Sequence, residues 1–336
     1  MRRLRAPLRL RLLLVVGLAA AAIPAACAAG GGDTAARAAT ERGWRPLHPA
    51  LLHRTEVGAA RVGGFIYVVG GFLSSSETTA AVERYDIRRD RWKRLTPMPL
   101  AVNHPAVAAL GGRLYVYGGY TDSGFSAVTA ALQSFDPGTG SWHRLRASPT
   151  ARAAAALVAA GGRLYAFGGA AGGRPLTTTE SYDPEQRRWR GLPPMNFARE
   201  HIAGVARPGR IYVLGGRAGG RNLRIVERYD PASSAWSRGP SLSFPRSGFA
   251  AVSVEGTIVA FGGEETRSGG STIRPVEALA PGAGSWSRLP GMLTPRHGLG
   301  GASYGRRIYA LEGGPSPGFA FSNAAEVIEL PSPRRR

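Results

Sequence analysis

A pair of adjacent glycines recurs six times along this chain, each time at the end of a short apolar run such as FIYVVGG or LYVYGG. The step between successive pairs is roughly 50 residues, the size of one small supersecondary unit. The tryptophans keep the same step. All six of them occur once per step, at Trp44, Trp92, Trp142, Trp189, Trp236 and Trp286. Two independent markers with one period indicate a repeat architecture, in which each unit packs only against its neighbours. The glycine pairs are Gly70–Gly71, Gly118–Gly119, Gly168–Gly169, Gly215–Gly216, Gly262–Gly263 and Gly313–Gly314.

Each repeat contains four short segments of strand type, separated by turns rich in Gly and Pro. In the second repeat we expect strands at residues 104–110, 113–119, 130–136 and 141–145. The hairpin turn between the first two strands is Gly111–Gly112, where the backbone needs positive φ. The third strand of the first four repeats ends in an aromatic residue followed by Asp, and the fourth strand carries the Trp.

The sixth repeat has no fourth strand and no Trp, whereas an extra strand-like segment at residues 41–47, around Trp44, precedes the first repeat. If this segment completes the last sheet, six sheets close into a ring and no long strand edge stays free. We therefore predict that residues 41–330 form one all-β, six-bladed β-propeller. Its blades are four-stranded and antiparallel, and the N-terminal strand closes the ring.

The diglycine, the Tyr-Asp ending and the Trp at this period resemble the kelch repeat. The resemblance covers nearly all of residues 41–330 and implies a bacterial, exported kelch-repeat protein with a six-bladed kelch β-propeller. We expect the glycines to serve backbone geometry and close packing. The Trp and Tyr side chains are expected to pack within or between blades.

The first 26 residues have the pattern of a signal peptide, with Arg-rich residues 2–11 followed by the apolar run Leu12–Ile23. The segment ends in Ile-Pro-Ala-Ala-Cys, which resembles a bacterial lipobox with Pro24 in place of the usual Leu. We predict lipidation of Cys27, with ordinary signal-peptidase cleavage as the alternative. Residues 27–40 read as a flexible tether, and 331–336 as a basic tail. The expected location is an exported one, as a cell-surface or periplasmic lipoprotein, and otherwise secreted.

The formal net charge is +21 and comes almost entirely from Arg. The Arg residues are spread over every repeat rather than gathered in one stripe, and the chain is expected to be exported. We therefore predict no nucleic-acid partner, although such a charge favours acidic glycans or anionic surfaces. The only membrane contact expected is the lipid anchor, and the protein is expected to be a monomer. Cys27 is the only cysteine, so no disulfide can form within the domain.

The loops between the second and third strands, which we call the b–c loops, vary between repeats and meet at one end of the ring. Variable loops on a rigid scaffold commonly carry binding sites. An alignment at the start of the first strand places a ring of basic side chains at the same end, with His104, His201 and His297 close behind it. We predict these positions as ligand-binding, with pairing to the recurrent glutamates of the third strand as the alternative role. The ring positions are Arg54, Asn103, Arg152, Arg199, Arg246 and Arg296. The glutamates are Glu83, Glu180, Glu227, Glu277 and Glu326.

Enzymes with kelch propellers offer two comparisons. Copper radical oxidases of this kind need a cysteine cross-linked to tyrosine, which this domain lacks. The bacterial sialic-acid mutarotases are exported kelch propellers, and that resemblance would require an Arg for the carboxylate and a Glu or His for proton transfer. The candidates here are Glu200, His201 and Glu264. Histidines 53, 104, 201 and 297 lie on different repeats, so we predict no metal and no cofactor.

We thus predict a non-catalytic binding scaffold that recognises an anionic glycan or an acidic protein segment at the b–c loop face. The alternative is a mutarotase or epimerase that acts on an anionic sugar such as sialic acid.

Overall fold

The computed structural model describes residues 43–265 and 270–331. The predicted signal peptide, the tether with Cys27, and the basic tail beyond residue 331 lie outside the described residues. In the described part of the chain, regular structure consists of strands. No helix within these ranges has the length and hydropathy needed to cross a membrane.

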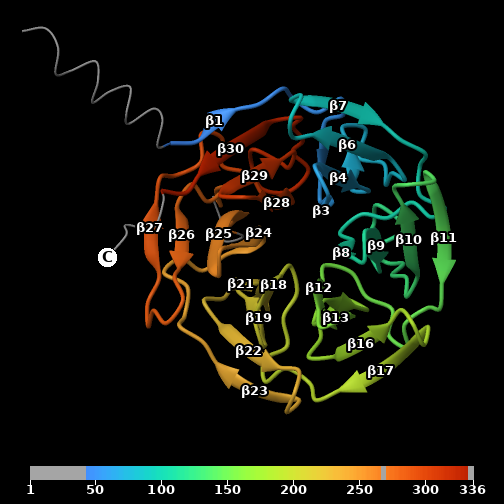
Figure 1. Ribbon diagram of the computed structural model, residues 1–336, viewed down its shortest axis with the longest axis vertical. Helices are drawn as coiled ribbons and strands as arrows, with labels where there is room; N and C mark the ends of the chain where they lie inside the picture. The colour runs from blue at the N-terminus through green and yellow to red at the C-terminus, as the bar shows by residue number, and fades with distance from the viewer. Residues whose placement is uncertain (1–42, 266–269, 332–336) are drawn as a thin grey trace, which may run out of the picture. The chain divides into compact units, whose positions relative to one another are not determined.

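Six four-stranded antiparallel sheets stand around a central axis as the blades of a propeller (Figure 1), which confirms the predicted fold. From the axis outward, blade 1 consists of β3 (Gly58–Val62), β4 (Phe65–Val69), β6 (Val82–Asp86) and β7 (Arg91–Arg94). Blade 2 consists of β8 (Ala106–Leu110), β9 (Arg113–Tyr117), β10 (Leu132–Asp136) and β11 (Ser141–Leu145). Blade 3 consists of β12 (Ala156–Ala160), β13 (Arg163–Phe167), β16 (Thr179–Asp183) and β17 (Arg188–Leu192). Blade 4 consists of β18 (Ala203–Arg207), β19 (Arg210–Leu214), β22 (Val226–Asp230) and β23 (Ala235–Arg238). Blade 5 consists of β24 (Ser247–Val254), β25 (Thr257–Glu264), β26 (Val276–Leu279) and β27 (Ser287–Leu289). Blade 6 consists of β28 (Gly300–Tyr304), β29 (Arg307–Leu311), β30 (Ala325–Glu329) and β1 (Arg45–Pro46).

The ring is closed by the N-terminal strand, as predicted. Strand β1 pairs with β30, with Arg45 opposite Val327 and Pro46 opposite Glu326. The Nε1 of Trp44 donates a 3.0 Å hydrogen bond to the carbonyl of Pro290 in blade 5, so Trp44 is the tryptophan of the last blade.

Every tryptophan holds its blade to the preceding one. In all six cases the indole Nε1 donates to a backbone carbonyl in the connection that leaves that neighbour, at 2.8–3.0 Å. Four of the indoles also pack on the aromatic residue at the end of their own blade's third strand, with ring centroids 5.0–5.2 Å apart. The tryptophans, whose spacing indicated the repeat, therefore form contacts between blades.

The diglycines end the second strands because two backbones approach there. A Cβ on Gly118 would lie 2.3 Å from the carbonyl of Arg152, and one on Gly119 would lie 2.7 Å from that of Asn103. The second glycine donates its N–H to the start of the next blade, as Gly119 does to the Arg152 carbonyl at 2.9 Å.

In blade 6 the structural equivalent of the diglycine is Glu312–Gly313, one residue earlier than the pair read from the sequence. Gly313 N donates to Arg54 O at 2.9 Å, the bond that the second glycine makes elsewhere. Glu312 has φ 55°, within the range of the first glycines.

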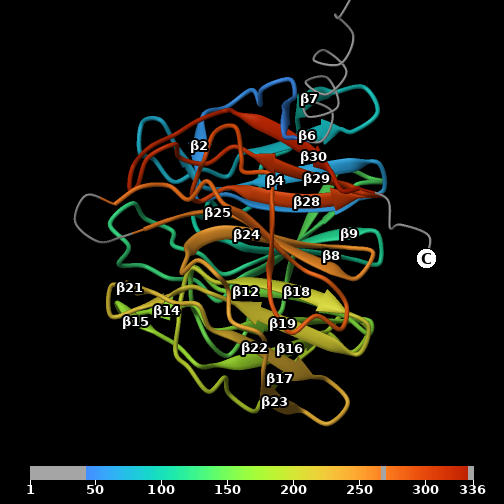
Figure 2. The ribbon, with the colours of Figure 1, turned by 90° about the vertical axis from the view of Figure 1, so that its left-hand side faces the viewer.

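The apolar core lies between adjacent blades. Between blades 1 and 2, for example, Tyr67, Val69, Leu114 and Val116 are buried in one cluster. Among the described residues, two b–c loops carry small two-stranded sheets: β14 (Ala170–Ala171) with β15 (Arg174–Pro175), and β20 (Arg217–Ala218) with β21 (Arg221–Asn222). In a third b–c loop, β5 (Phe72–Leu73) pairs with β2 (Arg54–Thr55), which precedes β3. Figure 2 shows β2, β14, β15 and β21 on the same side of the ring, so these b–c loops meet at one face, as predicted.

Candidate functional site

A closed circle of backbone hydrogen bonds surrounds the propeller axis at the b–c loop face. Its six bonds of 2.8–3.1 Å each join one blade to the next, from His104 N to Glu56 O around to Val57 N and Gly298 O. One residue per blade, at or just before the start of the innermost strand, takes part with φ between 52° and 60°, and Val57 donates in place of Glu56 where the circle closes. This left-handed conformation turns any side chain at these positions toward the axis. The six residues, which we call the axial positions, are Glu56, His104, Ala154, His201, Gly248 and Gly298.

The axial positions correct one member of the predicted Arg ring. In five blades the axial residue follows the Arg by two, so the equivalent residue in blade 2 is Val102 and not Asn103. The backbone agrees, because Gly71 N donates to Val102 O just as Gly119 N donates to Arg152 O. Asn103 corresponds instead to Glu200 and His297, the residues directly before an axial position.

The five arginines of the predicted ring are buried within the blades and do not line the face. Each side chain has no exposed surface and pairs with the recurrent glutamate of its own blade's third strand. Arg199, for example, donates to Glu227 Oε2 at 2.9 Å and to the carbonyls of Gly215 and Val213. The geometry therefore favours the alternative role considered from the sequence, pairing to blade carboxylates. Ligand binding at the five arginines stays a prediction, and none of these side chains has an exposed group that a ligand could contact. The five are Arg54, Arg152, Arg199, Arg246 and Arg296.

Above the axial positions lies a cavity of about 620 Å³, lined by the b–c loops and the residues around the axis. The three residues predicted as catalytic candidates, Glu200, His201 and Glu264, all line it. The structure thus brings together three side chains that lie on blades 4 and 5.

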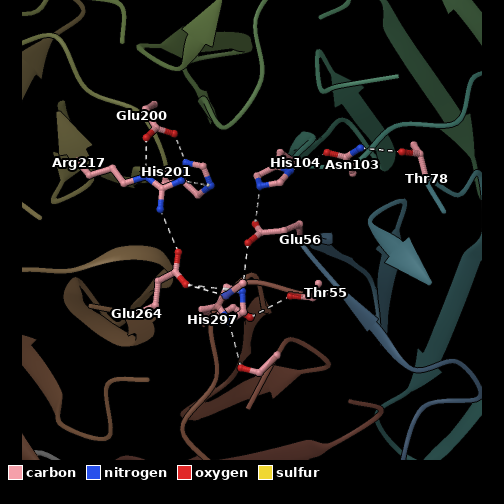
Figure 3. A network of polar contacts seen from close by, with 12 residues as sticks. Thr55, Glu56, Thr78, Asn103, His104, Glu200, His201, Arg217, Glu264 and His297 are labelled. Carbon is pink, nitrogen blue, oxygen red and sulfur yellow. Dashed lines mark hydrogen bonds and ion pairs between the residues drawn. The ribbon is translucent and has the colours of Figure 1, made fainter. Parts of the chain in front are cut away.

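The polar floor of the cavity forms two connected groups, drawn in Figure 3. In the first, Glu56 lies between two histidines, with Oε2 3.3 Å from His104 Nε2 and Oε1 3.5 Å from His297 Nε2. His104 Nδ1 is in turn 2.7 Å from Asn103 Oδ1. The imidazoles of His104 and His201 meet edge to face, with centroids 4.8 Å apart.

The second group is centred on Arg217. Its Nε donates to Glu200 Oε1 at 2.6 Å and its Nη1 donates to Glu264 Oε1 at 3.0 Å. Nη2 lies 3.3 Å from His201 Nε2, and His201 Nδ1 contacts Glu200 Oε2. Glu264 Oε2 is 3.8 Å from His297 Nε2, which links the two groups.

Burial and ion pairing shift the pKa values of the floor's acids and bases in opposite directions. Burial raises the pKa of Glu56 and lowers the pKa of His104 well below its usual value. Burial also acts to raise the pKa of Glu200, but His201 and Arg217 outweigh it and bring that pKa to about 2. Arg217 meets two carboxylates, so its charge is already balanced. Among the described residues, the floor therefore holds three carboxyl groups for one Arg, and this balance does not favour an acidic ligand.

Aromatic side chains form one wall of the cavity. Phe125 and Phe319 are 42% and 51% exposed, whereas Phe72 and Tyr120 behind them are buried. The ring centroids of Phe319 and Phe72 lie 5.1 Å apart, and those of Phe125 and Tyr120 lie 5.3 Å apart. Two large apolar rings are thus open to the cavity directly above charged groups.

Sequence reasoning missed Glu56, Arg217 and the aromatic wall. The repeat itself carried a signal for the first two: Glu56 aligns with His201, and Arg217 aligns with Glu264, directly after the second glycine. Phe125 and Phe319 come from b–c loops of different lengths, which have no common alignment and so gave no signal.

The fold and the cavity define a six-bladed propeller with a pocket at one end of its axis. The profile of the KLHDC2/KLHL20/DRC7 Kelch-repeats domain matches residues 56–263, and the chain belongs to the Kelch-repeat family. The structure is similar to one described as "Structure of YjhT", with a TM-score of 0.73 and 16% sequence identity, over 85% of this chain and 97% of that one. At this identity the likeness shows the fold alone. The search of curated proteins gave no match.

Proposed function

We propose that this protein is a binding propeller that takes up a saccharide unit in the cavity above the axial positions. The observation that carries the proposal is the wall of exposed aromatic rings directly above a floor of Glu, His and Arg side chains. A sugar ring has an apolar C–H face, which packs on aromatic rings, and a rim of hydroxyls, which hydrogen-bond to such a floor. The volume of about 620 Å³ is suited to a small ligand.

The charge of the floor supports a neutral saccharide over an acidic one. The anionic glycan or acidic segment expected from the sequence rested on a ring of arginines, and those side chains are buried. The one Arg that the described residues contribute to the floor, Arg217, already meets Glu200 and Glu264. A ligand carboxylate would have to displace one of these carboxylates or lie close to them, at a cost in electrostatic energy.

The test is a binding screen by saturation-transfer NMR and calorimetry with neutral sugars and with sialic and glucuronic acids. Phe319→Ala is expected to weaken binding of the best neutral ligand by about fivefold, because one aromatic contact contributes about 1 kcal/mol. The matched control is Tyr304→Ala, which removes an aromatic residue that is 41% exposed at the end of β28. Preferential binding of the acidic sugars, or equal affinities for Phe319→Ala and wild type, would contradict the proposal.

Catalysis of anomer interconversion is a second candidate, favoured by Glu264 and His297 at 3.8 Å in the same floor. One group would take the proton of the anomeric hydroxyl while another delivers a proton to the ring oxygen, so that the bond from C1 to the ring oxygen breaks. Closure of the free carbonyl on its other face then gives the second anomer. Exchange NMR on a bound sugar tests this step. Glu264→Gln is expected to slow the exchange while binding persists, and exchange no faster than in buffer would remove this candidate.

A further inference from the structure

We propose that Glu56, His104 and His201 form a binding site for a divalent first-row transition-metal ion, of which Zn²⁺ is the most suitable probe. The site lies on the propeller axis, and its fourth position faces the cavity. The inference is independent of the saccharide proposal, since it rests on different contacts and is measured without a sugar.

The donor atoms already lie close together. One ligand atom from each of the three residues falls within 4.8 Å of the others. The 3.3 Å between His104 Nε2 and Glu56 Oε2 matches the edge of a tetrahedron whose metal bonds are about 2.0–2.1 Å long, an edge of about 3.3–3.4 Å. Two imidazoles, one carboxylate and an open fourth position make a ligand set typical of zinc sites that bind a water or a substrate.

Both histidines are held by an oxygen acceptor on the nitrogen that faces away from the site. His104 Nδ1 lies 2.7 Å from Asn103 Oδ1, and His201 Nδ1 contacts Glu200 Oε2. An amide oxygen and a carboxylate oxygen can only accept, so each Nδ1 carries the proton and each Nε2 keeps its lone pair. Metal-binding histidines are commonly oriented by outer partners of this kind.

The backbone presents the three residues in equivalent positions. Glu56, His104 and His201 are axial positions, held by the circle of inter-blade hydrogen bonds. The other three axial positions are Ala154, Gly248 and Gly298, whose small or absent side chains leave room at the axis. His104 and His201 are 7% and 9% exposed, so the imidazoles have little freedom and are protected from water.

Arg217 opposes a cation at this site, because its Nη2 lies 3.3 Å from His201 Nε2. Its other two nitrogens stay bonded to Glu200 and Glu264, so a metal at His201 displaces only this single contact. The mixed nitrogen and oxygen donors suit Zn²⁺, Ni²⁺ or Co²⁺ better than Mg²⁺ or Ca²⁺, which prefer oxygen alone.

The experiment is calorimetric titration of Zn²⁺ into the chelator-treated full-length protein without an affinity tag, together with Co²⁺ absorption spectra. We expect one strong site per chain and the intense visible bands of tetrahedral Co²⁺. Glu56→Gln and His104→Ala should each weaken binding by more than about a hundredfold, because even the loss of an outer partner costs about ten- to a hundredfold. Glu56→Gln preserves the size of the side chain and gives a clear result even if the histidine variant folds poorly.

Three further variants separate this site from adventitious binding. His53→Ala and His143→Ala remove exposed histidines and should leave the strong site intact. Arg217→Gln should tighten binding severalfold, since it removes a positive charge beside His201. A lack of strong binding by the wild-type protein, or a strong site that survives Glu56→Gln, would overturn the proposal. So would weaker binding by Arg217→Gln or the loss of the site with either exposed histidine.

Discussion

Blade 2 shows that the buried arginine serves the blade and not a ligand. Where the other five blades have Arg paired with Glu, blade 2 has Val102 with Gln133, so both charges are missing together. Gln133 still accepts from the backbone N–H of Leu100 at 2.9 Å, as Glu227 does from Asn196 in blade 4. A buried charge without its partner is strongly destabilising, which accounts for the paired replacement.

The charge of Glu312 depends strongly on burial. It occupies the position of a first glycine, and its carboxyl shares Arg54 with Glu83. Its Oε2 has no hydrogen-bond partner among the described residues. Burial raises the pKa of Glu312 to about 8, with Arg54 acting in the opposite direction.

We predict that Glu312 makes the protein less stable as the pH rises from about 5 to 8. In this range the folded state keeps the proton that the unfolded state has lost, so the free energy of unfolding falls with pH, by up to about 1.4 kcal/mol per pH unit. Urea unfolding of wild type and Glu312→Gln at pH 5, 6, 7 and 8 isolates this contribution from that of the histidines. The variant should gain stability relative to wild type at each step, and a constant difference would show that Glu312 does not titrate there.

At the scale of the strand and its loop, two factors favour glycine in the diglycines: close packing by neighbouring atoms and a backbone conformation with positive φ. Gly168 and Gly172 separate these two effects. Their φ values are 53° and 55°, but a Cβ on Gly168 would lie 2.7 Å from the Arg199 carbonyl, whereas one on Gly172 would meet nothing within 4 Å.

We predict that Gly172→Ala costs only the left-handed strain of about 1–2 kcal/mol. Gly168→Ala adds overpacking to the same strain and should cost a further 1–3 kcal/mol, roughly. Chemical unfolding of both variants measures the difference. Equal losses of stability would mean that the diglycine serves backbone conformation alone.

The strands and loops also show how much of the fold and of the candidate site could be predicted from the sequence. Strand order, blade number and the face of the b–c loops follow from periodic glycines, tryptophans and turn residues, because these act through local geometry. The candidates Glu200, His201 and Glu264 came from their place on that face, and the structure brings them into one cavity. The sequence alignment was wrong by one residue at Asn103 and at Gly313, because it matched residues by type. In the structure, Val102 occupies the position that Arg has in the other blades, and Glu312 occupies the position of the first glycine.

For the whole molecule, the outer edge of the last blade is covered by a strand of two paired residues and held by one tryptophan. Without β1, the outer edge of β30 would be free, and Trp44 would no longer bond to Pro290 or pack on Phe261 at 5.7 Å. An exposed strand edge is a site for association with other chains.

We predict that a chain starting at residue 49 unfolds at a lower temperature and self-associates, relative to one starting at residue 41. The two chains differ only in the segment that contains β1, so the second is the matched control for loss of residues 1–40. Calorimetry and light scattering measure the two effects. Equal unfolding temperatures and two monomers would show that closure does not need this strand.

The sequence by itself determined the repeat, the blade number, the closing strand and the face on which a site belongs, since each is a periodic or local property. Only the tertiary structure decided which charged groups are buried and which meet at the axis. It placed the arginines inside the blades, because the buried Glu in each of five blade interiors needs a cation. It also gathered Glu56, His104 and His201 at the axis, because a circle of left-handed residues from separate blades turns them toward one point, and it placed Arg217 beside them from a b–c loop.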